Sequence, residues 1–195
     1  MYPDGLVDCV LRGWRPGIGD PEATGWLTVL AYLLCAGLAV AVWRRQPRGP
    51  GRTFWAVIAG LMLFLGLNKQ LDLQTALTQA GRCLAHAQGW YDQRRVVQAA
   101  FILGLLAASV MALLLARRML RGSLRGNRLA LIGLTVLTAF VMVRAVGFHH
   151  VDALIGRREF GVSTNYLFEN AGLLLIALNA AALLRRARGR AASRA

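Results

Sequence analysis

The chain has 195 residues, of which 56% are hydrophobic and only 16% are charged, against about 25% charged residues in an ordinary soluble domain. This composition excludes an average soluble domain and predicts an all-α integral membrane protein, because helices satisfy their own backbone hydrogen bonds in lipid. The net charge of +14 would by itself be compatible with nucleic-acid binding. No nucleic-acid-binding motif accompanies that charge, so we expect no nucleic-acid partner.

The N-terminal part of the chain predicts an outer arm followed by a membrane span. Residues 1–24 are polar and rich in glycine and proline, which is typical of a turn-rich segment, and a short helix is predicted near Leu6–Leu11. Residues 25–43 are almost uninterruptedly apolar. At about 1.5 Å per residue this run crosses hydrocarbon about 30 Å thick. Trp26 and Trp43 lie at its two ends, where amphipathic rings are favoured.

Four further spans follow, which makes a bundle of five transmembrane helices. They are predicted at residues 53–72, 96–116, 129–148 and 166–184. The transmembrane domain therefore covers residues 25–184, and a basic tail follows at residues 185–195.

The second span is unusual because its apolar part ends early. To reach a spanning length it must include the polar residues Asn68, Lys69 and Asp72. Residues 73–88 then have the amphipathic pattern of a helix that lies along or above the membrane surface.

The net positive charge of the chain comes from three segments that a five-span chain places on one side. These segments hold fourteen of the 23 basic residues and no acidic residue: Arg44, Arg45, Arg48 and Arg52; Arg117, Arg118, Arg121, Arg125 and Arg128; and Arg185, Arg186, Arg188, Arg190 and Arg194. Because cytoplasmic loops carry an excess of arginine and lysine, we predict that the N-terminus is outside and the C-terminus is cytoplasmic. The same arginines favour contact with anionic headgroups of the lipid bilayer.

Polar and ionisable residues form a cluster at the outer ends of three spans. The members of this outer cluster are Asn68, Lys69, Asp72, Arg144, His149, His150, Asp152, Tyr166, Glu169 and Asn170. No comparable cluster is predicted at the inner ends. Ionisable groups at membrane depth are costly, so they mark either a site or a structural polar contact. Three interpretations remain open.

The first interpretation is a metal site. Its ligands would be His149, His150, Asp152 and Glu169, with Asp72 as a further carboxylate. Imidazole and carboxylate ligands suit a divalent metal such as zinc, iron or manganese, and that metal would activate water. Adjacent histidines point about 100° apart on a helix, so a site that uses both requires the helix to end nearby.

The second interpretation is catalysis without a metal. Here His149 or His150 is the general base and Asp152 orients it, with Lys69 and Asp72 as further catalytic candidates. Lys69 is the single lysine beside 22 arginines, which favours a chemical requirement for lysine at this position.

The third interpretation is structural. In it Arg144 pairs with Glu169 or Asp72, and Lys69 pairs with an acid, because ions buried at membrane depth are normally paired. The polar cluster then holds helices together and performs no reaction.

The three cysteines have separate roles in this topology. Cys9 and Cys83 both fall on the outer side, where an oxidising compartment permits a disulfide between them. Cys35 lies mid-span and is predicted to be a small packing residue.

Several motifs together are similar to a family of small uncharacterised bacterial inner-membrane proteins, often labelled isopropylmalate isomerase. They are Asn68-Lys-Gln-Leu-Asp-Leu-Gln74, Gln88-Gly-Trp-Tyr91 followed by Arg94-Arg95, and Arg144 through Phe148-His-His-Val-Asp152. The resemblance runs from about residue 53 to residue 184. The isomerase resembles aconitase, a soluble fold with a cysteine-ligated iron–sulfur cluster, which does not fit three scattered cysteines and five spans. The resemblance therefore implies an architecture and the bacterial inner membrane, but no mechanism.

Two functions remain open from these observations. The first is a metal-dependent hydrolase or transferase that acts at the lipid surface through the outward-facing His/Asp/Glu cluster. The second is a non-catalytic accessory or scaffold subunit, which needs a protein partner. We also predict that small residues allow close helix contacts: Gly60, Gly66, Gly104, Ala107, Gly133 and Gly172.

Overall fold

The computed structural model describes residues 5–19, 21–146, 158–159 and 162–192. Its elements in chain order are α1 (Leu6–Gly13), α2 (Ala23–Arg45), α3 (Pro50–Leu71), α4 (Leu73–Ala87), the 3-10 helix η1 (Tyr91–Gln93), α5 (Arg94–Met119), α6 (Leu124–Val146), the short strands β1 (Arg158–Glu159) and β2 (Val162–Ser163), and α8 (Thr164–Ala192). The two strands pair antiparallel just before α8.

Five of these helices, namely α2, α3, α5, α6 and α8, are long and apolar enough to cross a membrane. This result confirms the all-α class and the presence of five helices that are long and apolar enough to span a membrane. Hydropathy located them well because a spanning helix needs about 20 apolar residues in one run. The structure also contains the short helix predicted in the arm and the amphipathic helix predicted after the second span, as α1 and α4.

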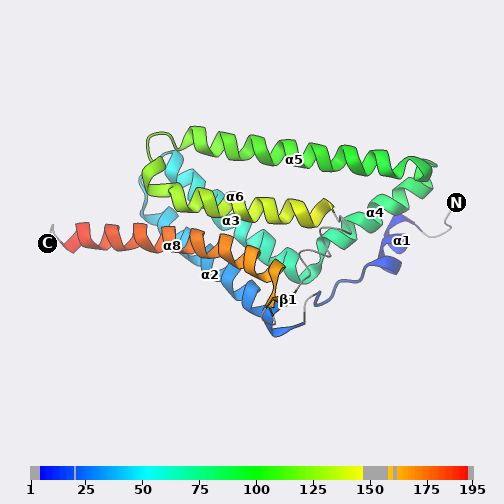
Figure 1. Cartoon of the computed structure of the whole chain (residues 1–195), viewed down its shortest axis with the longest axis horizontal. Coiled ribbons are helices and arrows are strands. Elements are labelled where there is room, and N and C mark those ends of the chain that lie inside the picture. Colours follow the sequence, from blue (N-terminus) through cyan, green and yellow to red (C-terminus); the bar gives the residue numbers. More distant parts are fainter. Residues whose placement is uncertain (1–4, 20, 147–157, 160–161, 193–195) are drawn as a thin grey trace.

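The long helices run side by side along the longest dimension of the molecule (Figure 1). Helix α2 packs against α3 and α8, α8 packs against α6, and α6 packs against α5. Side chains from α2, α3, α6 and α8 make the core, whose largest fully buried members include Tyr32, Trp55, Leu137 and Ile176.

Helix α5 differs from the other four spans because none of its residues is buried. In each of the other spans, 33–39% of the most apolar stretch is buried inside the protein. Helix α5 contacts α6, α3 and η1, so it is attached along one side of the bundle and presents the rest of its apolar surface outward.

The small residues predicted at helix contacts divide into two groups. A Cβ atom on Gly133 would lie 2.6 Å from the carbonyl oxygen of Gly172, and one on Gly66 would lie 3.2 Å from Tyr32 Cβ. These three glycines therefore allow close approach. The prediction was wrong for Gly60 and Gly104, where a Cβ atom would meet nothing within 4 Å, because those positions face away from the neighbouring helices.

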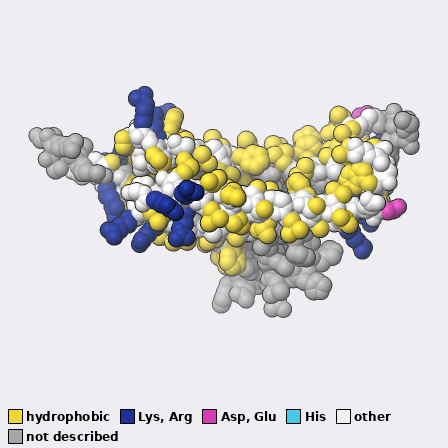
Figure 2. All heavy atoms as spheres, turned by 90° about the horizontal axis from the view of Figure 1, so that it is seen from above, with side chains coloured by type: hydrophobic (Ala, Val, Ile, Leu, Met, Phe, Trp, Pro, Cys, Tyr) yellow, Lys and Arg dark blue, Asp and Glu magenta, His cyan; other side chains and the backbone are white. Residues whose placement is uncertain are grey.

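The two ends of the bundle have different charge. The connections α2–α3 and α5–α6 and the C-terminal end of α8 lie together at one end, and the N-terminal arm and α4 lie at the other (Figure 1). Most of the visible lysine and arginine side chains gather at the first end, whereas the visible acidic side chains lie at the second (Figure 2). We call the first the arginine end and the second the arm end.

The arm is tied to the bundle at the arm end. Cys9 in α1 and Cys83 in α4 form a disulfide, which the sequence had left open as a possible pairing. The indole nitrogen of Trp14 donates to the carbonyl oxygen of Leu71 at 2.9 Å, and other arm groups also contact this end of α3. The arm therefore supplies donors for carbonyl groups that a helix C-terminus leaves unsatisfied.

Candidate functional site

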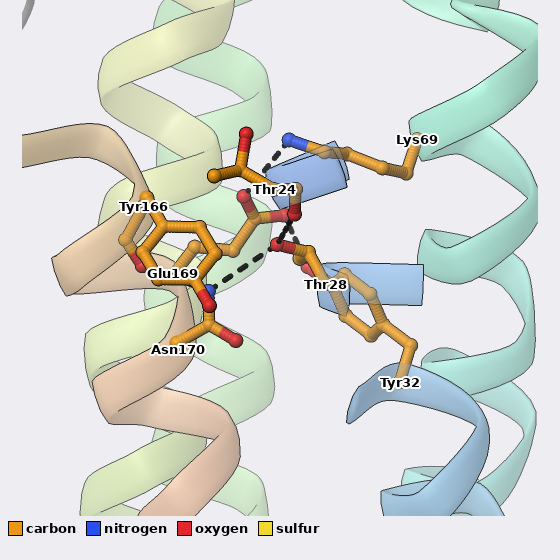
Figure 3. Close-up of polar contacts among 7 residues, drawn as sticks. All are labelled: Thr24, Thr28, Tyr32, Lys69, Tyr166, Glu169 and Asn170. Carbon is orange, nitrogen blue, oxygen red and sulfur yellow. Dashed lines mark hydrogen bonds and ion pairs between the residues drawn. The ribbon is translucent and has the colours of Figure 1, made fainter. Parts of the chain in front are cut away.

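The polar cluster is centred on Glu169, in the second turn of α8. This residue is only 4% exposed. Tyr32 on α2 donates its hydroxyl to Glu169 Oε1 at 2.9 Å. Lys69 on α3 lies with its Nζ 3.2 Å from Glu169 Oε2. Each carboxylate oxygen is thus engaged by a different helix, and α8, α2 and α3 are joined through one side chain (Figure 3).

A second polar contact lies beside the first and joins α8 to α2. Asn170 donates its Nδ2 to Thr28 Oγ1 at 3.3 Å and to the carbonyl oxygen of Tyr166 at 2.9 Å. Thr28 is completely buried and donates its hydroxyl to the carbonyl oxygen of Thr24 at 2.9 Å. The Thr28 hydroxyl therefore both donates and accepts, which removes the cost of burying it.

Lys69 and Glu169 form an ion pair that is largely shielded from water. The side chains of Lys69 and Glu169 are only 17% and 6% exposed, so water screens their attraction little. A buried charge is tolerated when it is paired and hydrogen-bonded, and Tyr32 supplies the additional hydrogen bond. This arrangement fixes the rotation of three helices relative to one another.

The structure describes only some of the predicted site residues. His149, His150 and Asp152 lie outside the described residues, as does the side chain of Arg144. The predicted Arg144–Glu169 ion pair therefore remains a prediction, while the described partner of Glu169 is Lys69.

Asp72 lies at the junction of α3 and α4 and not within a span. Its backbone is left-handed, with φ 46° and ψ 50°, and it ends α3. Its Oδ2 accepts a hydrogen bond from Thr75 Oγ1 at 2.6 Å. A short polar side chain tolerates this backbone conformation better than most residues do, so Asp72 redirects the chain from the span into the amphipathic helix.

Glu169 and Asp72 are the candidate metal ligands whose surroundings the structure describes. Within the described part of the chain, no three His, Cys, Asp or Glu side chains are close enough together to hold a metal ion. A site with zinc, iron or manganese would thus depend on the histidines of the 147–157 segment.

Sequence reasoning missed the contribution of α2 to this cluster. Thr24, Thr28 and Tyr32 are spaced by four residues, which places polar groups on one face of an apolar helix. That spacing was the available signal. Tyr32 was hard to recognise because a tyrosine in an apolar run is also compatible with packing or with a position at the membrane interface.

The expectation that the inner ends of the spans lack a polar cluster was wrong, since an uncharged one lies near the arginine end. Trp55 donates its Nε1 to Asn127 Oδ1 at 2.9 Å, which joins α3 to α6. Asn179 on α8 donates its Nδ2 to the carbonyl oxygen of Gly126 at 2.8 Å and accepts from the backbone amide of Ala130 at 3.0 Å. The cluster was missed because the predicted spans left Asn127 in a connecting segment and Asn179 stands alone in an apolar run, whereas buried asparagines require partners wherever they lie.

Asn179 on α8 contacts two backbone groups of α6 that lie one turn apart. Gly126 and Ala130 are four residues apart, so their carbonyl and amide groups are an i, i+4 pair of the helix. The side-chain amide of Asn179 hydrogen-bonds to both of these groups. Helix α8 therefore takes part in polar contacts at both ends of the bundle, through Glu169 and through Asn179.

No known family model, curated protein or solved structure matches this chain. The resemblance to bacterial inner-membrane proteins stays a prediction, and a functional proposal has to rest on the geometry of the chain itself.

Proposed function

We propose that this protein is a non-catalytic accessory or scaffold subunit of the bacterial inner membrane, whose polar cluster locks its helices together. One observation carries the proposal: both carboxylate oxygens of buried Glu169 are engaged, one by Tyr32 and one by Lys69. A carboxylate that binds substrate or accepts a proton needs an accessible oxygen. Glu169 offers its oxygens to two helices of its own bundle instead.

Two independent features support the orientation that we propose. Arginine-rich segments are retained on the cytoplasmic side, which favours an arginine end inside the cell, against the anionic headgroups of the inner leaflet. The Cys9–Cys83 disulfide lies at the arm end, and disulfides persist in oxidising compartments outside the cytoplasm. Charge and redox chemistry thus support the same assignment, with the N-terminus outside and the C-terminus cytoplasmic.

The accessory role is supported by α5. A single span without a buried residue contributes little to the stability of its own bundle. Its exposed apolar side chains include Phe101, Leu106, Met111 and Leu114. We place the contact with a membrane helix of a partner protein on this surface.

A double-mutant cycle at the ion pair tests the lock. Lys69→Met and Glu169→Gln each leave one charge without its partner and should each lower the free energy of unfolding by about 3 kcal/mol. The double variant Lys69→Met/Glu169→Gln keeps an acceptor for Tyr32 and should lie within about 1 kcal/mol of wild type. Thermal unfolding in detergent measures all four proteins, with Asp92→Asn as a surface control.

Two results would contradict the lock. Strictly additive losses would mean that Lys69 and Glu169 do not depend on each other. A single variant more stable than wild type would indicate a functional site, because active sites commonly sacrifice stability for function.

A further inference from the structure

A pocket of about 300 Å³ opens at the arginine end, between the end of α2 and the beginning of α3. It is lined by Trp43, Arg48, Gly49, Arg52, Thr53 and Ala56. None of these residues takes part in the Glu169 cluster, which lies toward the other end of the spans. The pocket is therefore separate from the Glu169 cluster.

The pocket is positively charged without internal compensation. Neither Arg48 nor Arg52 has a carboxylate partner among the residues that the structure describes. The loops at residues 44–52 and 117–128 and the tail from residue 185 contain no acidic residue at all. Two neighbouring guanidinium groups with no carboxylate nearby favour an anion, and their planar donor geometry suits phosphate oxygens.

One arginine is already positioned by an aromatic ring. The guanidinium carbon of Arg52 lies 5.4 Å from the centroid of the Trp43 ring, within the range of a cation–π contact. This contact limits the rotamers of Arg52, so less conformational entropy is lost when the side chain binds an anion.

The start of α3 adds to the attraction of the arginines. Gly49 is the N-cap residue with φ 152° and provides no side-chain hydrogen bond to the first turn. That backbone conformation is essentially restricted to glycine. The positive end of the helix dipole of the 22-residue α3 is thus directed toward the same pocket, where it favours a negative charge.

An apolar strip leads away from the pocket along α3. Ala56, Gly60, Leu63 and Leu67 follow Arg52 at intervals of three or four residues, which places them on one face of the helix. Leu63 and Leu67 are 46% and 62% exposed, and the space beside Gly60 is open. An anion with a hydrocarbon chain attached fits this surface better than a small inorganic ion does.

We propose that this pocket is a binding site for the phosphate group of an anionic phospholipid, with one acyl chain lying along the Ala56–Leu67 face of α3. The proposal rests on the membrane placement proposed above but not on the Glu169 lock. The ion-pair cycle reports on the arm end only, so failure of one proposal leaves the other intact.

Native mass spectrometry of the detergent-purified full chain tests the site by titration with phosphatidylglycerol, phosphatidylcholine and inorganic phosphate. Arg48→Gln/Arg52→Gln should weaken phosphatidylglycerol binding by about tenfold or more. The control Arg117→Gln/Arg118→Gln removes the same charge from the same end and should change binding by less than about twofold. Thr53→Phe fills the pocket while both arginines remain, and it should also lower binding about tenfold.

Specific outcomes would overturn the assignment. Equal losses in the two arginine pairs would mean that the lipid responds to overall charge and not to this pocket. Wild-type binding by Thr53→Phe would mean that the pocket is not occupied. Inorganic phosphate that competes with phosphatidylglycerol at equal concentration would assign the site to a soluble phosphate compound. Circular dichroism of each variant establishes that the helices are intact.

Discussion

Gly133 and Gly172 face each other where α6 and α8 cross, and a Cβ atom at Gly133 would lie 2.6 Å from the carbonyl oxygen of Gly172. This distance leaves no room for even a methyl group. Small residues permit such close contacts, which drive helix association in lipid through packing. The crossing lies between the polar contacts at the two ends of the bundle and holds α6 and α8 together at mid-span.

The crossing makes a testable prediction. Gly133→Ala should force the two helices apart and destabilise the bundle by about 1–3 kcal/mol. Gly60→Ala is the matched control, since a Cβ atom there meets nothing within 4 Å. The control should be neutral or slightly stabilising, because alanine favours helix more than glycine does. Thermal unfolding in detergent compares the two, and equal effects would contradict the crossing.

Replacing the tryptophan of the uncharged cluster should lower the free energy of unfolding more than replacing an exposed tryptophan does. Trp55→Phe keeps an aromatic ring but removes the donor to Asn127 Oδ1, and leaving this buried acceptor unpaired should cost about 1–3 kcal/mol. Trp26 is 44% exposed, so Trp26→Phe should cost less than about 0.5 kcal/mol. Unfolding midpoints of the two variants measure the difference. A smaller effect at Trp55 than at Trp26 would show that the hydrogen bond contributes nothing.

The proposed orientation predicts which introduced thiols a membrane-impermeant maleimide reaches in spheroplasts. Ala87→Cys, at the arm end, should be labelled directly. Ser123→Cys, at the arginine end, should be labelled only after the membrane is permeabilised. Cys9 and Cys83 should react only after reduction, because they form a disulfide. Direct labelling of Ser123→Cys in sealed spheroplasts would reverse the assigned topology.

The accessory role predicts a partner at α5. A photo-crosslinking amino acid at Met111, which is 57% exposed, should give one discrete protein adduct in native membranes. The same group at Leu30 in α2, which is 59% exposed, should give none, since that helix belongs to the packed bundle. Mass spectrometry of the adduct distinguishes another protein from a second copy of this chain. Equal adducts at both positions, or none at either, would argue against a partner helix on α5.

The metal hypothesis for His149, His150, Asp152 and Glu169 has its own measurement. Near-stoichiometric zinc, iron or manganese in the purified protein, lost in His149→Ala/His150→Ala, is the result that a metal-dependent hydrolase or transferase requires. Elemental mass spectrometry measures the content, and circular dichroism checks the fold. An equal metal content in wild type and variant would remove the histidines from the hypothesis.

The sequence was informative where the physics is local. The number and position of the long apolar helices follow from the length of the apolar runs, and the difference in charge between the two ends of the bundle follows from counting arginines in the connecting segments. Both signals, the length of an apolar run and the number of arginines in a connection, depend only on residues that are close in sequence. The helix at Leu73–Ala87 was likewise predicted from a local amphipathic pattern.

The tertiary structure decided how each helix is rotated about its axis, and therefore which residues meet. Lys69 and Glu169 are 100 positions apart, and no local pattern selects Lys69 as the described partner of Glu169. Rotation likewise separates Gly133, at a crossing, from Gly60, beside open space. In an apolar bundle the hydrophobic effect barely distinguishes one face of a span from another, so close packing and polar contacts decide the rotation. Those contacts exist only once the chain has folded.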